Sequence, residues 1–367
     1  MTKLRMRTTI GVALVALGSV LAACVPQAPT TPGPCVDGWK QIFEAPVADT
    51  HPPTVPDAPY LGNIGSAALS GNGRYLALGA TPATSAITVR DLVTGVIEAA
   101  PGSTYLDRAP LISADGSVVA FERYTLPTNS IDPPRSTVVW NRVTGAVDTV
   151  TAAADSQPID MTPDGASVLV RVDSFDIHDP SWTIVFDTPT ATATRLDLSS
   201  IVPDSFTRPT AMSDDARNIA LTVTSRSDYS RTTGIFHRDS GRLTPLANGY
   251  IEALDGDGQI AAVVNDGSPY SGSIWHVATN TLSQLGADLP LAINRAGTSA
   301  IVMQWPVGPL PAAVPVSSLD LATGQHHLIS GSASLFSPNF GVSGSADFDR
   351  VVVVETSPNR AVVKQRC

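Results

Sequence analysis

Few residues of this chain are of types that do chemistry. Its 367 residues include three cysteines, Cys24, Cys35 and Cys367, and six histidines. The one adjacent histidine pair, His326 and His327, would point to opposite faces of a strand, which does not suit a shared metal. The sequence has no nucleophile elbow, zinc-protease motif, Cys-x-x-Cys, P-loop or dinucleotide-binding motif. We therefore predict no catalytic residues, no metal ligands and no cofactor.

Aromatic side chains beside charges of both signs occur in five polar segments, at 123–136, 173–182, 225–232, 265–271 and 304–315. Such mixtures suit a recognition surface, and solvated loops are the alternative. The candidates are Tyr124, Arg135, Asp176, His178, Trp182, Arg226, Tyr229, Arg231, Tyr270 and Trp305. Segment 173–179 also carries carboxylates that could bind calcium, but it lacks the spacing and the glycine of an EF-hand loop.

The N-terminal segment is typical of an export signal. Lys3, Arg5 and Arg7 precede an uncharged, largely apolar run from 10 to 23, which is too short to span a bilayer comfortably. The run ends in Leu-Ala-Ala-Cys24 and resembles a bacterial lipoprotein box; an ordinary cleaved signal or an anchor is the alternative. The resemblance implies a signal peptide at 1–23 and a lipid-modified, acylated Cys24. Residues 24–34 are rich in proline and predict a semi-extended tether.

In that family the lipid places the protein on the outer face of the cell membrane or on the outer membrane. Val25 is not aspartate, and in a bacterium with two membranes the family rule then favours the outer membrane. Acyl chains would provide the contact with the membrane, since no later stretch is apolar enough to cross it.

The amino-acid composition limits both the class of binding partner and the class of fold. The formal net charge is −10, and loss of residues 1–23 removes only cations, so the remaining chain is more acidic still. An acidic surface argues against nucleic acid as a partner. Frequent glycine and proline argue against a helix-rich fold.

A sequence repeat with two halves recurs along the chain. Its first half is a turn, often Asp-Gly or Asn-Gly, followed by an apolar run that suits a strand covered on both faces. Its copies are Ser70–Leu78, Ser113–Phe121, Thr162–Val170, Ser213–Leu221, Asp255–Val263 and Asn294–Val302, with a weaker seventh that begins at Ser343. The second half is a strand, a short turn and another strand. Its copies begin at Ile87, Thr137, Thr183, Thr233, Gly272 and Val316.

These repeats resemble the WD40-like repeats of TolB-type β-propellers, over residues 35–367. The resemblance implies an all-β fold, a single seven-bladed β-propeller, with six blades as the main alternative. The last unit lacks an outer strand, and we expect the segment from Cys35 to Phe43 to supply it. Antiparallel pairing would then bring Cys35 beside Cys367, and exported proteins retain disulfides. We predict a Cys35–Cys367 disulfide.

We expect a monomer that binds a protein, a peptide or an envelope glycan through the loop-rich face of the ring and that is not an enzyme. The alternative is a propeller enzyme, such as a lyase, a lactonase or a quinoprotein-type dehydrogenase, with its site in the central channel. Such an enzyme needs polar groups on the innermost strands. Those strands, expected near 67–69, 111–112, 159–161 and 291–293, are mostly apolar apart from Asp160.

Overall fold

The computed structural model describes residues 33–46, 66–80, 86–104, 107–124, 135–150, 155–173, 181–198, 201, 205–266, 270–304, 313–334, 342–356 and 359–367. Regular structure in these ranges is β-strand throughout, which confirms the all-β prediction. Within the same ranges there is no helix with the length and apolar character of a membrane span. The proposed signal peptide, Cys24 and most of the tether lie outside the described residues.

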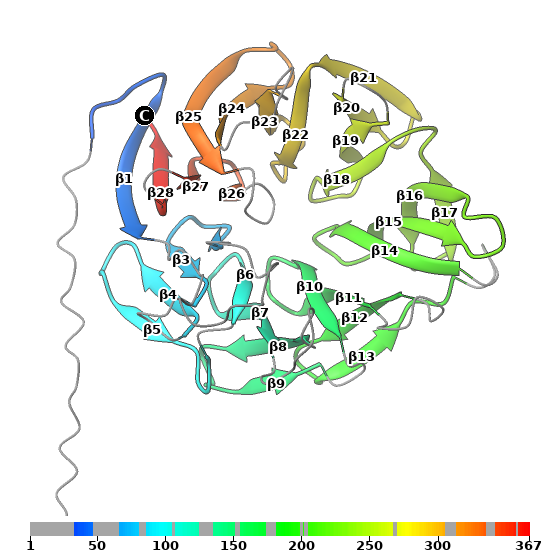
Figure 1. Cartoon of the computed structure of the whole chain (residues 1–367), viewed down its shortest axis with the longest axis horizontal. Helices are drawn as coiled ribbons and strands as arrows, with labels where there is room; N and C mark the ends of the chain where they lie inside the picture. The colour runs from blue at the N-terminus through cyan, green and yellow to red at the C-terminus, as the bar shows by residue number, and fades with distance from the viewer. Residues whose placement is uncertain are drawn as a thin grey trace, which may run out of the picture.

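The strands form a ring of blades around a common centre (Figure 1). Five blades are separate four-stranded antiparallel sheets in chain order. Blade 1 contains β2 (Ala67–Leu69), β3 (Tyr75–Leu78), β4 (Thr88–Asp91) and β5 (Ile97–Ala99). Blade 2 contains β6 (Arg108–Ile112), β7 (Val118–Tyr124), β8 (Arg135–Asn141) and β9 (Val147–Thr149). Blade 3 contains β10 (Ser156–Met161), β11 (Ser167–Val172), β12 (Trp182–Asp187) and β13 (Thr192–Arg195). Blade 4 contains β14 (Ser205–Met212), β15 (Asn218–Ser225), β16 (Arg231–His237) and β17 (Arg242–Pro245). Blade 5 contains β18 (Tyr250–Leu254), β19 (Ile260–Asn265), β20 (Ser271–His276) and β21 (Thr281–Gly286).

The last two blades share one eight-stranded sheet. Blade 6 contains β22 (Asp288–Ile293), β23 (Ser299–Gln304), β24 (Ala313–Asp320) and β25 (His326–Ser334). Blade 7 contains β26 (Val342–Gly344), β27 (Arg350–Thr356), β28 (Asn359–Arg366) and β1 (Trp39–Pro46). The two blades join where Ala333 of β25 pairs with Glu355 of β27. The ring thus has seven blades, as expected.

The turn of blade 7 lies two residues later than the sequence pattern indicated. Ser343 belongs to β26, and the turn begins at Ser345, whose N–H donates to the Arg350 carbonyl at 2.8 Å. Ser113 makes the same bond to Val118 in blade 2, at 2.9 Å. The prediction was wrong because this turn places Phe348, with φ of 55°, where most other blades have glycine.

Apolar layers between neighbouring blades form the core. In blades 2 to 5 the next-to-last residue of the third strand is aromatic, and its side chain packs on the preceding blade. Trp140 packs with Ala77 and Val89 of blade 1. Phe186 packs with Val118 of blade 2, Phe236 with Leu169 of blade 3, and Trp275 with Ala211 of blade 4.

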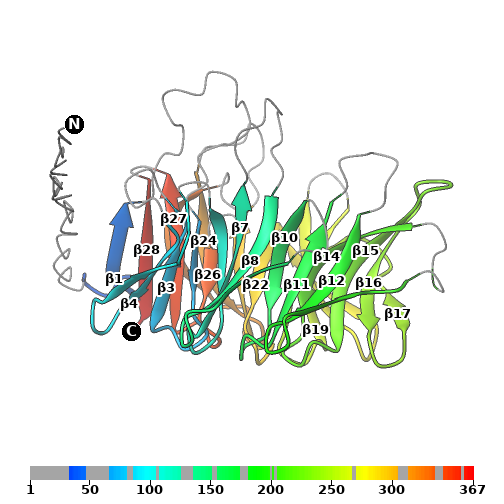
Figure 2. The same ribbon diagram turned by 90° about the horizontal axis from the view of Figure 1, so that it is seen from below.

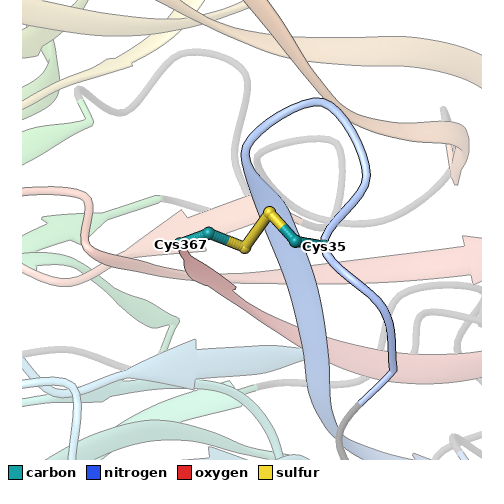
Figure 3. The surroundings of a disulfide bond; sticks show 2 residues. All are labelled: Cys35 and Cys367. Atoms are coloured by element: carbon teal, nitrogen blue, oxygen red, sulfur yellow. A yellow bond between two sulfur atoms is a disulfide. The ribbon is translucent and has the colours of Figure 1, made fainter.

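The N-terminal strand closes the ring. β1 pairs antiparallel with β28, from Trp39↔Arg366 to Pro46↔Arg360, and becomes the outer strand of blade 7. Cys35 and Cys367 form the predicted disulfide, with their Cα atoms 6.3 Å apart (Figure 3). Antiparallel pairing sets this proximity because the start of β1 lies beside the end of β28.

Charged side chains reinforce the same closure. Arg360 Nη1 lies 2.8 Å from Glu44 of β1, and Arg360 Nη2 lies 2.9 Å from Glu355 of β27. Glu355 is buried and also accepts a hydrogen bond from Ser330 Oγ of blade 6 at 2.8 Å. One polar network therefore ties blade 6, blade 7 and the N-terminal strand together.

Candidate binding site at the channel mouth

The strands run between two faces of the ring (Figure 2). On the turn face, short turns join the first strand of a blade to the second and the third to the fourth. On the loop face, the second strand leads to the third, and the predicted binding residues belong to these connections or flank them. The chain ends on the turn face, and the disulfide lies there with it (Figure 2).

One position on the innermost strands is polar in four successive blades. It lies five residues before the first residue of the inner turn, towards the loop face. Arg108, Gln157, Arg208 and Tyr250 occupy it, and we call these four residues the mouth arc. Their cross-strand partners Glu122, Arg171, Thr222 and Val264 are equivalent to one another, which confirms the alignment. In blade 6 the same position holds the buried Leu289.

The sequence pattern predicted apolar innermost strands, and the mouth arc corrects this. Two of the strands begin earlier than expected, at Arg108 and Ser156, and the prediction did not cover the innermost strands of blades 4 and 5, which begin at Ser205 and Tyr250. Arg208 and Glu252 are exposed although the two faces of their strands pack against neighbouring blades. The exposed side chains of these two residues therefore face the centre of the ring or its mouth.

Buried polar atoms at the mouth lack hydrogen-bond partners among the described residues. They are Nε of Arg108, Oε1 of Gln157 and Oγ1 of Thr210, which lies two residues after Arg208. A buried polar group without a partner is costly, and native proteins rarely leave one unless a ligand or water satisfies it. Three such atoms lie on three successive innermost strands, β6, β10 and β14.

Arg108 lies in a buried cluster between blades 2 and 3. It is 9% exposed, and its guanidinium carbon lies 5.3 Å from the centre of the Tyr124 ring. Burial lowers the pKa of Arg108. Tyr124 donates its hydroxyl hydrogen to Glu122 Oε2 at 3.1 Å, and burial raises the pKa of Glu122. Burial, helped by Glu122, raises the pKa of Tyr124 to about 12, so this hydroxyl remains a donor at physiological pH.

Arg135 extends the cluster onto blade 3. Its Nε donates to Asp155 Oδ1 at 2.8 Å, and its Nη2 donates to Asp173 Oδ2 at 3.0 Å. Arg171 Nη2 lies 2.9 Å from the same Asp173 oxygen. Burial opposes the charge of Arg135, but Glu122 and Asp155 outweigh it, and the pKa of Arg135 is raised. The predicted residues Tyr124 and Arg135 are thus brought together, next to Arg108.

On the far side of the arc, Arg231 Nη1 donates to the Tyr250 hydroxyl at 3.2 Å. Glu252 lies two residues further along β18. Neighbouring groups shield its carboxylate from water although the residue is partly open to solvent, and this desolvation raises the pKa of Glu252; the positive charge of Arg208 counteracts part of that rise. Arg208 and Glu252 therefore offer a donor and an acceptor on the neighbouring innermost strands β14 and β18.

The remaining predicted residues are spread over the loop face. Tyr229, 74% exposed, and Tyr270, 45% exposed, present their rings to solvent. Arg226 is partly exposed beside the β15–β16 turn. Trp182 packs against the apolar layer between blades 2 and 3, with Arg195 5.0 Å from its ring centre, and so forms part of the blade wall. Asp176, His178 and Trp305 lie outside the described residues.

A chain of backbone hydrogen bonds links the inner turns on the turn face. In six of the seven blades, one residue of the inner turn donates its N–H to a carbonyl in the turn of a neighbouring blade. The bonds are Asn72 to Ala114, Ala114 to Pro163, Asp214 to Gly256, Gly256 to Arg295, Arg295 to Ala346 and Ala346 to Gly71. Pro163 has no N–H to donate, and between blades 3 and 4 Asp160 Oδ2 instead accepts from the Met212 N–H at 2.8 Å.

A charged pair lies across the turn-face end of the channel. Arg295 Nε of blade 6 is 3.5 Å from Asp214 Oδ2 of blade 4. A Cβ atom added at Gly71 of blade 1 would lie 3.7 Å from Arg295 Nη2, so this side chain spans several blades. The mouth arc lies at the other end of the innermost strands, towards the loop face. No group of three potential metal ligands occurs among the described residues.

No family model matches the sequence, and no curated protein matches it. Solved structures do match. The β-propeller domain of the trilobed protease from Pyrococcus furiosus has 13% identity and a TM-score of 0.57, over 82% of this chain and 94% of that one. Oligogalacturonate lyase in complex with manganese has 13% identity and a TM-score of 0.58, over 82% and 88%. TolB from Acinetobacter baumannii has 16% identity and a TM-score of 0.47; the match covers 71% of this chain and 64% of TolB. The ring and the first two matches define this chain as a β-propeller.

Proposed function

We propose that this propeller is a lipid-anchored, extracytoplasmic binding module that is not an enzyme and holds a protein, a peptide or an envelope glycan at the mouth arc. The observation that carries the proposal is the set of unpartnered buried atoms on Arg108, Gln157 and Thr210. Exposed Tyr229 and Tyr270 on the same face supply the aromatic contacts that interfaces favour.

The position of Cys35 supports this arrangement. The tether meets the propeller at Cys35, and the disulfide holds Cys35 on the turn face. A lipid on Cys24 would then hold the turn face towards the membrane. The loop face and the mouth arc would point away from the membrane, towards partners in the envelope.

Affinity capture from solubilised envelopes tests the binding proposal. Arg208→Ala should reduce recovery of the partner by about tenfold, because a charge-assisted hydrogen bond contributes roughly 1.5–3 kcal/mol. Arg217→Ala is the matched control on the turn face of the same blade, where Arg217 is 66% exposed, and it should leave recovery unchanged. Equal loss in both variants, or in neither, would count against the mouth arc.

The lipid anchor is tested separately. Cys24→Ala should move the protein from the detergent phase to the aqueous phase, since the acyl chains supply the membrane affinity. Mass spectrometry of the wild-type N-terminal peptide should show the acyl groups. Detergent partitioning that does not depend on Cys24 would remove this part of the proposal.

One observation favours the enzyme alternative, a lyase, lactonase or quinoprotein-type dehydrogenase with its site in the channel. Desolvation raises the pKa of Glu252 on the innermost strand β18, as is common for acid–base groups. Turnover of lactone or oligouronate substrates that is lost in Glu252→Gln and retained in Arg217→Ala would favour that alternative.

A further inference from the structure

The layer between blades 5 and 6 lacks the aromatic side chain that four other layers contain; the equivalent residues of blades 1 and 7, Arg90 and Lys364, are not aromatic either. In blades 2 to 5 the third strand places Trp140, Phe186, Phe236 or Trp275 against the preceding blade. The equivalent residue of blade 6 is Leu319, which packs in a small cluster with Ala300 and Val302. Leucine is smaller than an aromatic side chain and leaves part of this layer unfilled.

A cavity of about 350 Å³ occupies this layer. Leu319 forms part of its wall, together with Ile274 and Leu285. It is open to solvent, because Gln284 and His326 in its lining are exposed. This volume lies within the range of small-molecule sites, and the position is one where other blades bury a six-membered or indole ring.

The polar part of the cavity is acidic. Asp288 lies in its lining, and one carboxylate oxygen, Oδ2, is 3.3 Å from His326 Nε2. The other oxygen, Oδ1, is buried and accepts no hydrogen bond from the described residues. Asp320 also lines the cavity, and the lining contains neither lysine nor arginine. An occupant that donates hydrogen bonds and carries positive charge would satisfy Asp288.

We propose that the cavity between blades 5 and 6 binds a small aromatic amine. The ring takes the place that tryptophan or phenylalanine fills between other blades, against Leu319, Ile274 and Leu285. The ammonium group donates to Asp288. Trp275 provides an internal precedent, because its ring is fully buried between blades 4 and 5 and its Nε1 donates to Asn280 Oδ1 at 3.0 Å. This site is separate from the mouth arc and does not depend on its function.

Isothermal titration calorimetry of the full-length protein in detergent tests the proposal, with tryptamine as the probe. Tryptamine should bind saturably to one site. Two smaller ligands separate the contributions of the ring and of the ammonium group to binding. The first, 3-methylindole, has the ring without the ammonium, and ethylamine has the ammonium without a ring. Each should bind at least about tenfold more weakly than tryptamine, because each loses either the charged hydrogen bond or the apolar burial.

Two variants locate the site. Leu319→Trp places in blade 6 the residue that blades 2 and 5 already carry, and it should abolish tryptamine binding while the melting temperature stays the same or rises. Asp288→Asn should weaken tryptamine by about tenfold and leave 3-methylindole unchanged. If Leu319→Trp does not fold, tryptamine binding by Leu319→Phe and by Asp288→Asn tests the proposal instead. Absence of saturable binding at millimolar tryptamine, or equal binding by wild type and both variants, would overturn the proposal.

Discussion

Asp160 was the one polar residue that the sequence placed on an innermost strand, where the enzyme alternative required polar groups. Its contacts give it a structural role. Its two carboxylate oxygens accept the N–H groups of Met161 and Met212, each at 2.8 Å, and the second bond bridges the interruption that Pro163 makes in the chain of turns. Burial nevertheless raises the pKa of Asp160 to about 6, since the two hydrogen bonds offset only part of the cost of a buried charge.

This pKa predicts a pH-dependent stability. The folded pKa lies above the ordinary value of 3.8, so the contribution of Asp160 is complete below pH 3.8 and is lost as the pH rises through about 6. The difference corresponds to about 3 kcal/mol. Asp160→Asn removes this titration and no other. Urea unfolding should therefore show wild type losing about 3 kcal/mol relative to the variant between pH 3.5 and pH 7. A difference between the two proteins that does not change with pH would contradict this explanation.

The innermost strands show where inference from sequence succeeds and where it fails. Turn residues and apolar runs located six repeats, because a buried strand and a reversing turn each need particular residue types. The mouth arc was missed because Arg108, Gln157 and Arg208 look like loop residues in the sequence. They belong to strands all the same, since the edge of an innermost strand faces the channel and not another strand. Counting back five residues from Ser113, Thr162, Ser213 and Asp255 would have found them.

Closure was predictable for a related reason. The last unit lacked an outer strand, and the segment after Cys35 has the sequence of a strand that could complete it. Antiparallel pairing of that strand with the end of the chain then predicted the disulfide. The cavity beside Leu319 was not predictable, because a leucine in an apolar run looks like any other core residue. Only comparison with Trp275 and its equivalents in three dimensions shows that a ring is missing.

Two glycines of blade 2, one in its inner turn and one in its outer turn, provide a test of how tightly neighbouring blades pack. Gly116, with φ of 78°, and Gly145, with φ of 76°, both adopt a backbone conformation that disfavours side chains. A Cβ at Gly116 would collide with the ring of Tyr75 in blade 1, whereas a Cβ at Gly145 would meet nothing. Gly145→Ala should cost about 1 kcal/mol from the backbone alone. Gly116→Ala should cost about 3 kcal/mol because the collision adds to it. Equal losses in urea unfolding would show that the blades do not meet as described.

At the scale of the whole molecule, the two ends of the ring have different structures. The turn face holds the disulfide, the chain of turn–turn hydrogen bonds and the Arg295–Asp214 pair. The loop face holds the mouth arc and the exposed tyrosines. The disulfide also holds Cys35, just before β1, on the turn face. This division is the basis of the proposal that the module is anchored at one face and binds at the other.

The disulfide should contribute to stability because it closes a very long loop, with a sequence separation of 332 between the two cysteines. The chain-entropy model gives about 6 kcal/mol as an upper figure, and measured gains are commonly about 2–4 kcal/mol. Cys367→Ser should lower the free energy of unfolding by that amount in urea. Wild type treated with reductant should then match the variant. Unchanged stability in Cys367→Ser would show that the pairing of β1 with β28 closes the ring without help.

Binding through the loop face is the central claim, and site-specific photo-crosslinking in intact cells tests it most directly. A photoreactive residue replaces Tyr229 on the loop face or, in a matched strain, Val143 in the β8–β9 turn on the opposite face; both side chains are well exposed, at 74% and 80%. The predicted result is one discrete adduct from position 229, lost when Arg208→Ala is added, and none from position 143. Adducts from position 143 with none from position 229 would contradict binding through the loop face.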